Sequence, residues 1–345
     1  MKLALSIILL VFFTSNISWG QSFVEIRKEL NEYKVYSSIE DALTNPESVY
    51  RLNLNNSKIN ERLLEESLEK FQNLRELLLS NTFISKIPSS ISNLKELQIL
   101  EIGHLEEQNL NLFKIPKSIK KLKKIVYINL IGNPNLEWRK TFLYLSKLPE
   151  LINVALMYNN YKKLPEEITQ LSSLKMIWLG KNPNLDLKDT FSKLSKLDNL
   201  SQMGIGGNGH NELPDEIILL KNIHNLWLSG NNWKNLNGLQ HLPKLSQLSL
   251  HNCNLSQFPK DLIHCKKLEY LSFLGNPNMD FNEVLKVTPP SVKILNLSDN
   301  NINKLSINSL SKTNLEKLIL NNNKILESDL KKYQQANKNL EILYK

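Results

Sequence analysis

Cysteine is nearly absent from this sequence, and no long apolar run follows its first residues. The 345 residues include two cysteines, Cys253 and Cys265, which excludes a framework of several disulfide bonds. No segment after residue 20 is apolar enough to span a bilayer, since a membrane-spanning helix needs about 20 apolar residues. We therefore expect no transmembrane segment in the mature chain. With 41% hydrophobic and 22% charged residues, the composition is that of a globular protein.

The start of the chain predicts an export signal. Lys2 supplies a positive charge, and Leu3–Phe13 form an almost unbroken apolar run of 11 residues, too short for a membrane anchor. Ser18 and Gly20 are the small residues that a signal peptidase reads, so residues 1–20 are expected to be removed. No cysteine follows the apolar run, which excludes a lipoprotein signal. The mature chain is expected to be periplasmic, cell-surface or secreted.

Motifs of catalysis and of metal or cofactor binding are also lacking. The six histidines show neither H-E-x-x-H nor finger spacing, so no metal site is predicted. We find no nucleophile elbow, phosphate loop or recognisable carboxylate pair, and we expect neither a cofactor nor an enzyme. Gly204–Gly209 read G-x-G-x-x-G, but a dinucleotide site needs a helix to follow. No amphipathic helix follows here, which favours a structural role for these glycines.

The formal net charge of +9 has two interpretations. It indicates a solvated, lysine-rich convex surface, or it indicates attraction to an anionic partner. The first is favoured because Lys, Glu and Asp are interspersed. A run of six lysines between Lys114 and Lys124 has the same two interpretations. It indicates either a solvated surface or binding to anionic lipid headgroups or glycans. Nucleic acid is not expected, because the chain is exported and has no recognition motif.

One pattern, L-x-x-L-x-L-x-x-N-x-L, recurs along nearly the whole chain, with other apolar residues allowed at the Leu positions. Twelve copies follow one another at spacings of 22 to 28 residues. They begin at Val49, Leu74, Leu97, Ile125, Leu151, Leu174, Leu200, Ile223, Leu245, Leu268, Val292 and Leu315. A further copy begins at Leu340 and stops at Lys345. Residues 49–345 are therefore predicted to form a repeat solenoid, in which each repeat is stabilised by its neighbours.

The repeat has a physical logic. The alternating L-x-L predicts a short strand with one face in the core, and the rest of each repeat supplies the crossover that parallel strands need. The Asn is expected to turn inward and to satisfy backbone groups that water cannot reach. It is present in eight repeats, at Asn133, Asn159, Asn182, Asn208, Asn231, Asn276, Asn300 and Asn323. Leu105 takes its place in the longest repeat, so irregular geometry is expected from Gly103 to Phe113.

Both cysteines fall on interior positions of this pattern. Cys253 takes the place of the Asn, and Cys265 takes that of a Leu in its crossover. Because buried, unpaired cysteine behaves as a small apolar side chain, we predict two free buried thiols.

Two kinds of crossover largely alternate. One carries an apolar residue followed by Pro, at Pro88, Pro116, Pro165, Pro214 and Pro259, and predicts a short turn or one-turn helix on the convex side. The other reads N-P-N-(L/M), at Pro134, Pro183 and Pro277.

These strings resemble the plant-type and Ras-group-like leucine-rich repeats, which also occur in exported bacterial proteins. The resemblance covers residues 49–345. It implies an α/β repeat solenoid, a right-handed horseshoe with a parallel concave β-sheet and short helical, 3-10 or turn segments on the convex side. It also implies binding of proteins or peptides, and it supplies no catalytic residues.

The two ends are expected to be capped, because an open solenoid end exposes its core. Residues 21–48 are predicted to form a helical cap over the first strand. Within them Ser37 and Glu40 form a capping-box signature before an apolar run. Residues 328–337 are predicted to form a helix that closes the other end together with Leu340 and Leu343.

Positions three, five and seven of each repeat are expected to face the concave side. In the fifth-position column Trp178 and Trp227 flank the bare Gly204, which predicts two indoles about 10 Å apart across an empty slot. The candidate partner-binding residues are Tyr127, Met157, Tyr158, Met176, Trp178, Gly204, Trp227, His251, Tyr270 and Leu274. The predicted function is non-catalytic recognition of a protein or peptide outside the cytosol. The alternative is a glycan- or envelope-binding surface protein.

Overall fold

The computed structural model describes residues 21–82, 84–103 and 112–345, with side chains from Phe23 onward. The predicted signal peptide lies outside the described residues, and so do residues 104–111, which make up most of the Gly103–Phe113 segment expected to be irregular. The chain divides into two compact units. The first holds the described residues up to Ala155 together with Ser173–Lys175, and the second holds Leu156–Ser172 and Met176–Lys345. Each unit is described by itself below.

The twelve repeats contribute one short strand each, β2 to β13, while β1 precedes them and β14 belongs to the incomplete last copy. Over the described residues these fourteen parallel strands follow one another in sheet order β1 to β14. They are β1 Val35–Tyr36, β2 Arg51–Asn53, β3 Glu76–Leu78, β4 Ile99–Glu101, β5 Tyr127–Asn129, β6 Asn153–Ala155, β7 Met176–Trp178, β8 Gln202–Gly204, β9 Asn225–Trp227, β10 Gln247–Ser249, β11 Tyr270–Ser272, β12 Ile294–Asn296, β13 Lys317–Ile319 and β14 Glu341–Leu343. In the second unit Met176 pairs with Gln202, and Gln202 with Asn225, so equivalent repeat positions form columns across the sheet. The central residues of β7, β8 and β9, which are Ile177, Met203 and Leu226, are fully buried, as the alternating pattern predicts.

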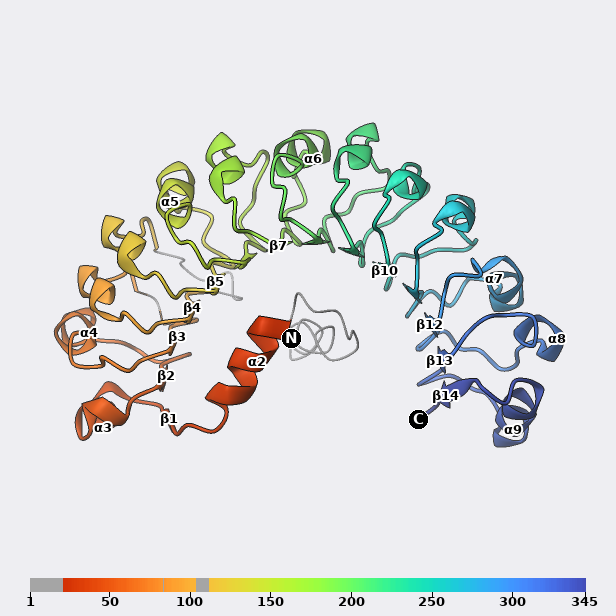
Figure 1. Ribbon diagram of the computed structural model, residues 1–345, viewed down its shortest axis with the longest axis horizontal. Coiled ribbons are helices and arrows are strands. Elements are labelled where there is room, and N and C mark those ends of the chain that lie inside the picture. The colour runs from red at the N-terminus through yellow and green to blue at the C-terminus, as the bar shows by residue number, and fades with distance from the viewer. Residues whose placement is uncertain (1–20, 83, 104–111) are drawn as a thin grey trace. The chain divides into compact units, whose positions relative to one another are not determined.

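The described ranges contain eight α-helices and seven 3-10 helices, and all of them except α2 lie in crossovers between strands. The α-helices are α2 Gln21–Leu30, α3 Ile39–Leu43, α4 Glu61–Leu68, α5 Trp138–Leu145, α6 Leu187–Leu194, α7 Phe281–Val287, α8 Ile307–Leu310 and α9 Glu327–Ala336. The 3-10 helices are η1 Pro46–Ser48, η2 Ser89–Asn93, η3 Lys117–Lys121, η4 Glu166–Gln170, η5 Asp215–Leu219, η6 Leu239–His241 and η7 Lys260–His264. Apart from α2, the helices of each unit lie on one side of its strands (Figure 1). We call the opposite side of the sheet the concave face.

The two kinds of crossover form different helices. Each of the five crossovers with Pro after an apolar residue forms a 3-10 helix directly after that Pro, which confirms the predicted one-turn segment. The N-P-N-(L/M) crossovers form the longer helices α5, α6 and α7. In α6 and α7 an aspartate side chain, Asp186 or Asp280, accepts hydrogen bonds from backbone N–H groups of the first turn. The sequence pattern therefore distinguishes two crossover structures as well as two motifs.

The repeated asparagines form a ladder through the second unit, as predicted, with Cys253 in one of its positions and a half-buried last member, Asn323. The side-chain amide of Asn276 donates to the carbonyls of Leu250 and Phe273, at 2.8 and 3.0 Å. Its side-chain oxygen accepts from the backbone N–H groups of Cys253 and Leu255, at 3.0 and 3.1 Å. Each such asparagine thus joins its own repeat to the preceding one through groups that water cannot reach.

Both cysteines are buried and free, which confirms the prediction. In the Asn position, the Cys253 thiol donates to the carbonyls of Leu228 and His251, at 3.6 and 3.4 Å. It therefore keeps part of the hydrogen bonding that the asparagines provide elsewhere.

The N-terminal segment differs from the expected cap. β1 pairs with β2 and extends the sheet, while α2 lies against the concave face of the first unit rather than over the first strand (Figure 1). The predicted capping residue is wrong by one position. Ser38, rather than Ser37, precedes α3, and its hydroxyl accepts from the Asp41 N–H at 3.1 Å.

At the other end, α9 confirms the predicted helix, and β14 pairs with β13 as the last strand. The α/β repeat solenoid with a parallel sheet is thereby confirmed. Across the described chain no helix is both long and apolar enough to cross a bilayer.

Candidate functional site

The two central tryptophans of the second unit are in contact, so the predicted empty slot between them is wrong. Their ring centroids lie 4.7 Å apart, with 34° between the ring planes. Trp178 lies over Gly204, because a Cβ atom on this glycine would come within 2.4 Å of Cε3 of that indole. The glycine therefore provides the floor on which the indole lies. Contact between the rings removes apolar surface from water that an empty slot would expose.

Burial separates the roles of the two indoles. Trp178 is buried, with 8% of its surface exposed, whereas Trp227 is half-buried. Met176, two residues before Trp178, is also buried. Trp227 is therefore the accessible member of the pair, and Trp178 supports it from below.

Formal charge is absent from the concave positions of β7 to β12 in the second unit. By strand, positions three, five and seven are Met176, Trp178 and Gly180; Gln202, Gly204 and Gly206; Asn225, Trp227 and Ser229; Gln247, Ser249 and His251; Tyr270, Ser272 and Leu274; and Ile294, Asn296 and Ser298. Charged residues make up 22% of the chain, so their absence from this surface sets it apart. We call it the neutral face. It offers amides, hydroxyls and aromatic rings, and it suits a ligand without dense charge.

Three polar atoms of the neutral face lack hydrogen-bond partners among the described residues. They are Oδ1 of Asn225, Nε2 of His251 and Oγ of Ser272, and all three are buried. Burial also lowers the pKa of His251 to about 4, so its imidazole is neutral at ordinary pH. Buried polar groups are usually hydrogen-bonded, so these atoms are exceptions, but the protein itself already covers them.

The remaining predicted site residues lie in different surroundings. Tyr270 and Leu274 are half-buried on the neutral face, and burial raises the pKa of the Tyr270 hydroxyl. Met157 is half-buried, and Tyr158 is exposed in the turn that follows it. Tyr127 belongs to the first unit, where α2 covers it, so it is not accessible.

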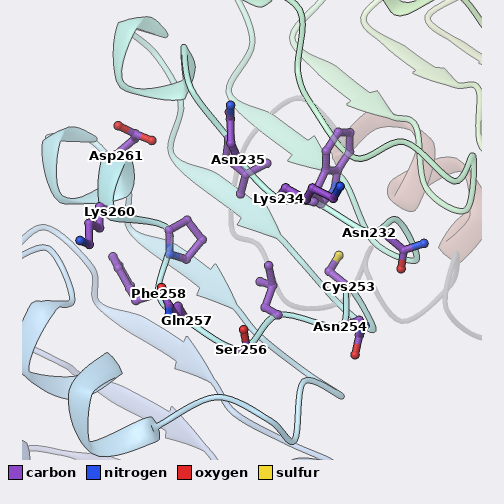
Figure 2. A pocket seen from close by; sticks show the side chains of 14 residues that line it. Asn232, Lys234, Asn235, Cys253, Asn254, Ser256, Gln257, Phe258, Lys260 and Asp261 are labelled. Carbon is purple, nitrogen blue, oxygen red and sulfur yellow. The ribbon is translucent and has the colours of Figure 1, made fainter.

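A cavity of about 660 Å³ lies on the flank of the second unit, and the sequence did not predict it. Figure 2 shows Lys234 and Asn235 from the loop after β9, opposite Ser256 and Gln257 from the loop after β10 and Lys260 at the start of η7. One feature of the sequence could have indicated this cavity. The repeat that begins at Ile223 is 22 residues long, which is the shortest spacing of the twelve. The lining of the cavity is largely polar, and the cavity lies away from the neutral face.

The lysine run of the first unit lies at the solvated surface, in agreement with the first of its two interpretations. Lys124 pairs with Glu96 at 2.5 Å, and Lys123 donates to the Lys147 carbonyl at 2.9 Å. The Lys120 ammonium lies 5.7 Å from the ring centroid of Tyr144. These lysines therefore contact groups of their own unit while remaining at its surface.

The structure gives no binding role to the G-x-G-x-x-G string or to the histidines among the described residues. The glycines after β8 lead into a turn, and η5 begins only at Asp215. Among residues 21–82, 84–103 and 112–345, no cluster of His, Cys, Asp and Glu side chains is placed to hold a metal ion.

Comparison with known proteins places the fold. No protein-family model matches the sequence, and no curated protein matches it. An internalin, InlF, from Listeria monocytogenes is similar in structure, with a TM-score of 0.53 and 21% identity over 88% of this chain and 92% of that chain. A leucine-rich-repeat protein of Leptospira interrogans aligns with a TM-score of 0.37 and 20% identity, over 90% of this chain and 99% of that chain. At this identity the likeness to the internalin concerns the fold.

Proposed function

This chain is a leucine-rich-repeat protein in its fold, and from that premise we propose that it is a non-catalytic module that binds a protein or peptide partner on its neutral face. Repeat solenoids present a wide, rigid sheet surface, which suits recognition of an extended partner. The predicted export signal adds that this binding takes place outside the cytosol.

The observation that carries the proposal is the Trp178–Trp227 pair on a surface without formal charge. Tryptophan and tyrosine are favoured anchors of protein interfaces, because they bury a large area with few rotatable bonds. Trp227 and Tyr270 each retain accessible surface, and the half-buried Gln247 offers a polar side chain on the same face. An apolar centre with polar groups around it is the usual anatomy of a protein interface.

The experiment first identifies the partner and then tests the face. A photo-crosslinking residue at Gln247, on the neutral face, is compared with one at Leu219, which is 42% exposed on η5. A protein from envelope extract that is crosslinked only from Gln247 is then titrated against the wild-type chain, Trp227→Ala and the matched control Leu219→Ala.

We expect Trp227→Ala to weaken the affinity at least tenfold, since truncated aromatic anchors typically cost 2 kcal/mol or more at roughly 1.4 kcal/mol per decade. Leu219→Ala should bind as the wild type does. A folded Trp227→Ala protein with unchanged affinity would contradict the proposal. Saturable binding to one glycan class, with no protein partner, would favour the alternative of a glycan- or envelope-binding surface protein.

A further inference from the structure

The concave face of the first unit is covered by the helix α2 (Figure 1). Phe23, Arg27 and Leu30 have the spacing i, i+4 and i+7, which places them on one side of a helix. Phe23 and Leu30 are buried, and the Phe23 ring packs against Tyr127 of β5 with 4.9 Å between centroids. At the other end of α2, the Leu30 carbonyl accepts from Nη1 of Arg51 on β2 at 3.1 Å. The helix therefore crosses the sheet from β5 to β2.

Beneath α2 the sheet holds two buried carboxylates. Glu76 on β3 and Glu101 on β4 are diagonal neighbours, since Glu76 pairs with Ile99 and Leu78 with Glu101. Their side chains are 1% and 15% exposed. Burial raises the pKa of Glu101, the Arg27 charge opposes that rise, and the Glu76 carboxylate adds to it. Two carboxylates buried this close need a cation.

Arg27 supplies that cation from outside the sheet. One of its guanidinium nitrogens pairs with Glu76, and the other pairs with Oε1 of Glu101 at 2.6 Å. Arg51 also reaches Glu76, with its Nε 2.6 Å from Oε2. Among the described residues, Arg27 is the cation paired with Glu101. The sheet by itself therefore leaves one buried carboxylate without a countercharge, in a geometry that suits the two-pronged guanidinium.

The attachment of α2 otherwise consists of few contacts. At the rim, the exposed Glu29 carboxylate accepts both terminal nitrogens of Arg75, at 2.6 and 2.9 Å. A helix of 10 residues is not stable alone in water, so α2 depends on these contacts. Ion pairs at a surface contribute little and weaken with salt. Another helix with the same side-chain pattern would make the same contacts.

We propose that this surface, formed by Arg75, Glu76, Glu101 and Tyr127, binds a partner helix that presents an aromatic residue, an arginine and an aliphatic residue at spacing i, i+4 and i+7. In this arrangement α2 is an intramolecular occupant that the partner helix displaces. We call the surface the acidic helix site. It lies in the first unit and does not depend on the function proposed for the neutral face.

The test supplies α2 as a separate molecule. A fluorescent peptide of residues 21–32 is titrated against the full chain carrying Phe23→Ser and Arg27→Gln, which releases its own α2. The control chain carries Lys28→Gln, an equal loss of charge at an exposed position of the same helix. A control peptide carries Arg27→Gln. Hydrogen exchange of residues 23–30 reports whether α2 is bound in each chain.

We expect fast exchange in the release variant and protected exchange in Lys28→Gln. The peptide should bind the release variant saturably, and at least about tenfold more weakly to the wild type, because α2 competes. The Arg27→Gln peptide should also bind at least about tenfold more weakly, since it leaves the Glu101 carboxylate unpaired. Protected exchange in the release variant, absence of saturable binding, or equal binding of the two peptides would each overturn the proposal.

Should the double substitution unfold the chain, Glu101→Gln takes its place in the exchange experiment. It removes the carboxylate that only Arg27 neutralises among the described residues, and it nearly keeps the side-chain volume. We expect residues 23–30 of this variant to exchange at least about tenfold faster than in the wild type. Unchanged protection would show that the ion pair does not hold α2, and would overturn the proposal.

Discussion

Replacing Gly204 by alanine is the most direct test of how the two tryptophans are held. The new Cβ atom would lie 2.4 Å from Cε3 and 2.7 Å from Cζ3 of Trp178. Non-bonded carbon atoms normally stay about 3.5–4.0 Å apart. Because Gly204 lies within a paired strand, the indole has to move rather than the backbone. Moving it breaks its contact with Trp227.

The expected cost follows from the surface that Trp178 buries. A buried tryptophan removes roughly 150–250 Å² from water, and re-exposing on the order of 100 Å² costs about 2.5 kcal/mol at about 25 cal/mol per Å². Loss of the aromatic pair adds about 0.5–1.5 kcal/mol. We therefore expect Gly204→Ala to lower the free energy of unfolding by about 3 kcal/mol.

Urea denaturation followed by tryptophan fluorescence measures this cost, and near-UV circular dichroism reports on the paired indoles. Gly209→Ala is the control, because its φ of +78° is strained for alanine while no atom lies within 4 Å of the new Cβ. It should cost only about 1–2 kcal/mol. In a Trp178→Ala background, Gly204→Ala should be nearly neutral. An equal cost of Gly204→Ala with and without the Trp178 indole would refute this reasoning.

Three further predictions concern the core and the neutral face. Asn276→Leu removes buried hydrogen bonds on both sides of its repeat and should cost about 3 kcal/mol or more in urea denaturation, whereas Asn278→Leu, at an exposed position, should change stability little. Burial raises the pKa of Cys253 to about 11 and that of Cys265 to about 12, so both thiols should resist a thiol reagent in the folded chain, and denaturant without reductant should reveal both. Burial lowers the pKa of His251 from 6.5 to about 4, so the unfolded chain binds more protons between these values. Wild-type stability should therefore fall more than that of His251→Gln as the pH drops from 6.5 to 4, and parallel urea midpoints would contradict this assignment.

Features that repeat along the chain were predictable from the sequence. The strands, the asparagine ladder and the burial of Cys253 and Cys265 follow from one periodic pattern, because each repeat places the same position in the same surroundings. Even the substitution of Cys253 for asparagine is understandable from that frame, since a thiol is small and donates a weak hydrogen bond.

Features outside the frame, or at its open surface, were not predictable. The pattern assigns Trp178, Gly204 and Trp227 to one column, but it does not say how the rings lie within it. The 10 Å slot was expected from strand spacing alone, and the indole instead lies down on the glycine. The helix α2 precedes the first repeat, so no periodicity indicates where it docks. Arg27 and Glu101, 74 residues apart, meet only in the folded chain.

The sequence by itself thus determined the parallel sheet, its register, its two kinds of crossover and the absence of charge from the concave positions of β7 to β12. These features depend on local spacing that is repeated many times. Only the tertiary structure decided that Trp178 supports Trp227, that the chain's own helix occupies the concave face over Glu76 and Glu101, and that a cavity opens at the shortest repeat. The physical reason is that side chains on an open face settle by competition for apolar contact and countercharge, and their partners come from segments that sequence spacing does not relate.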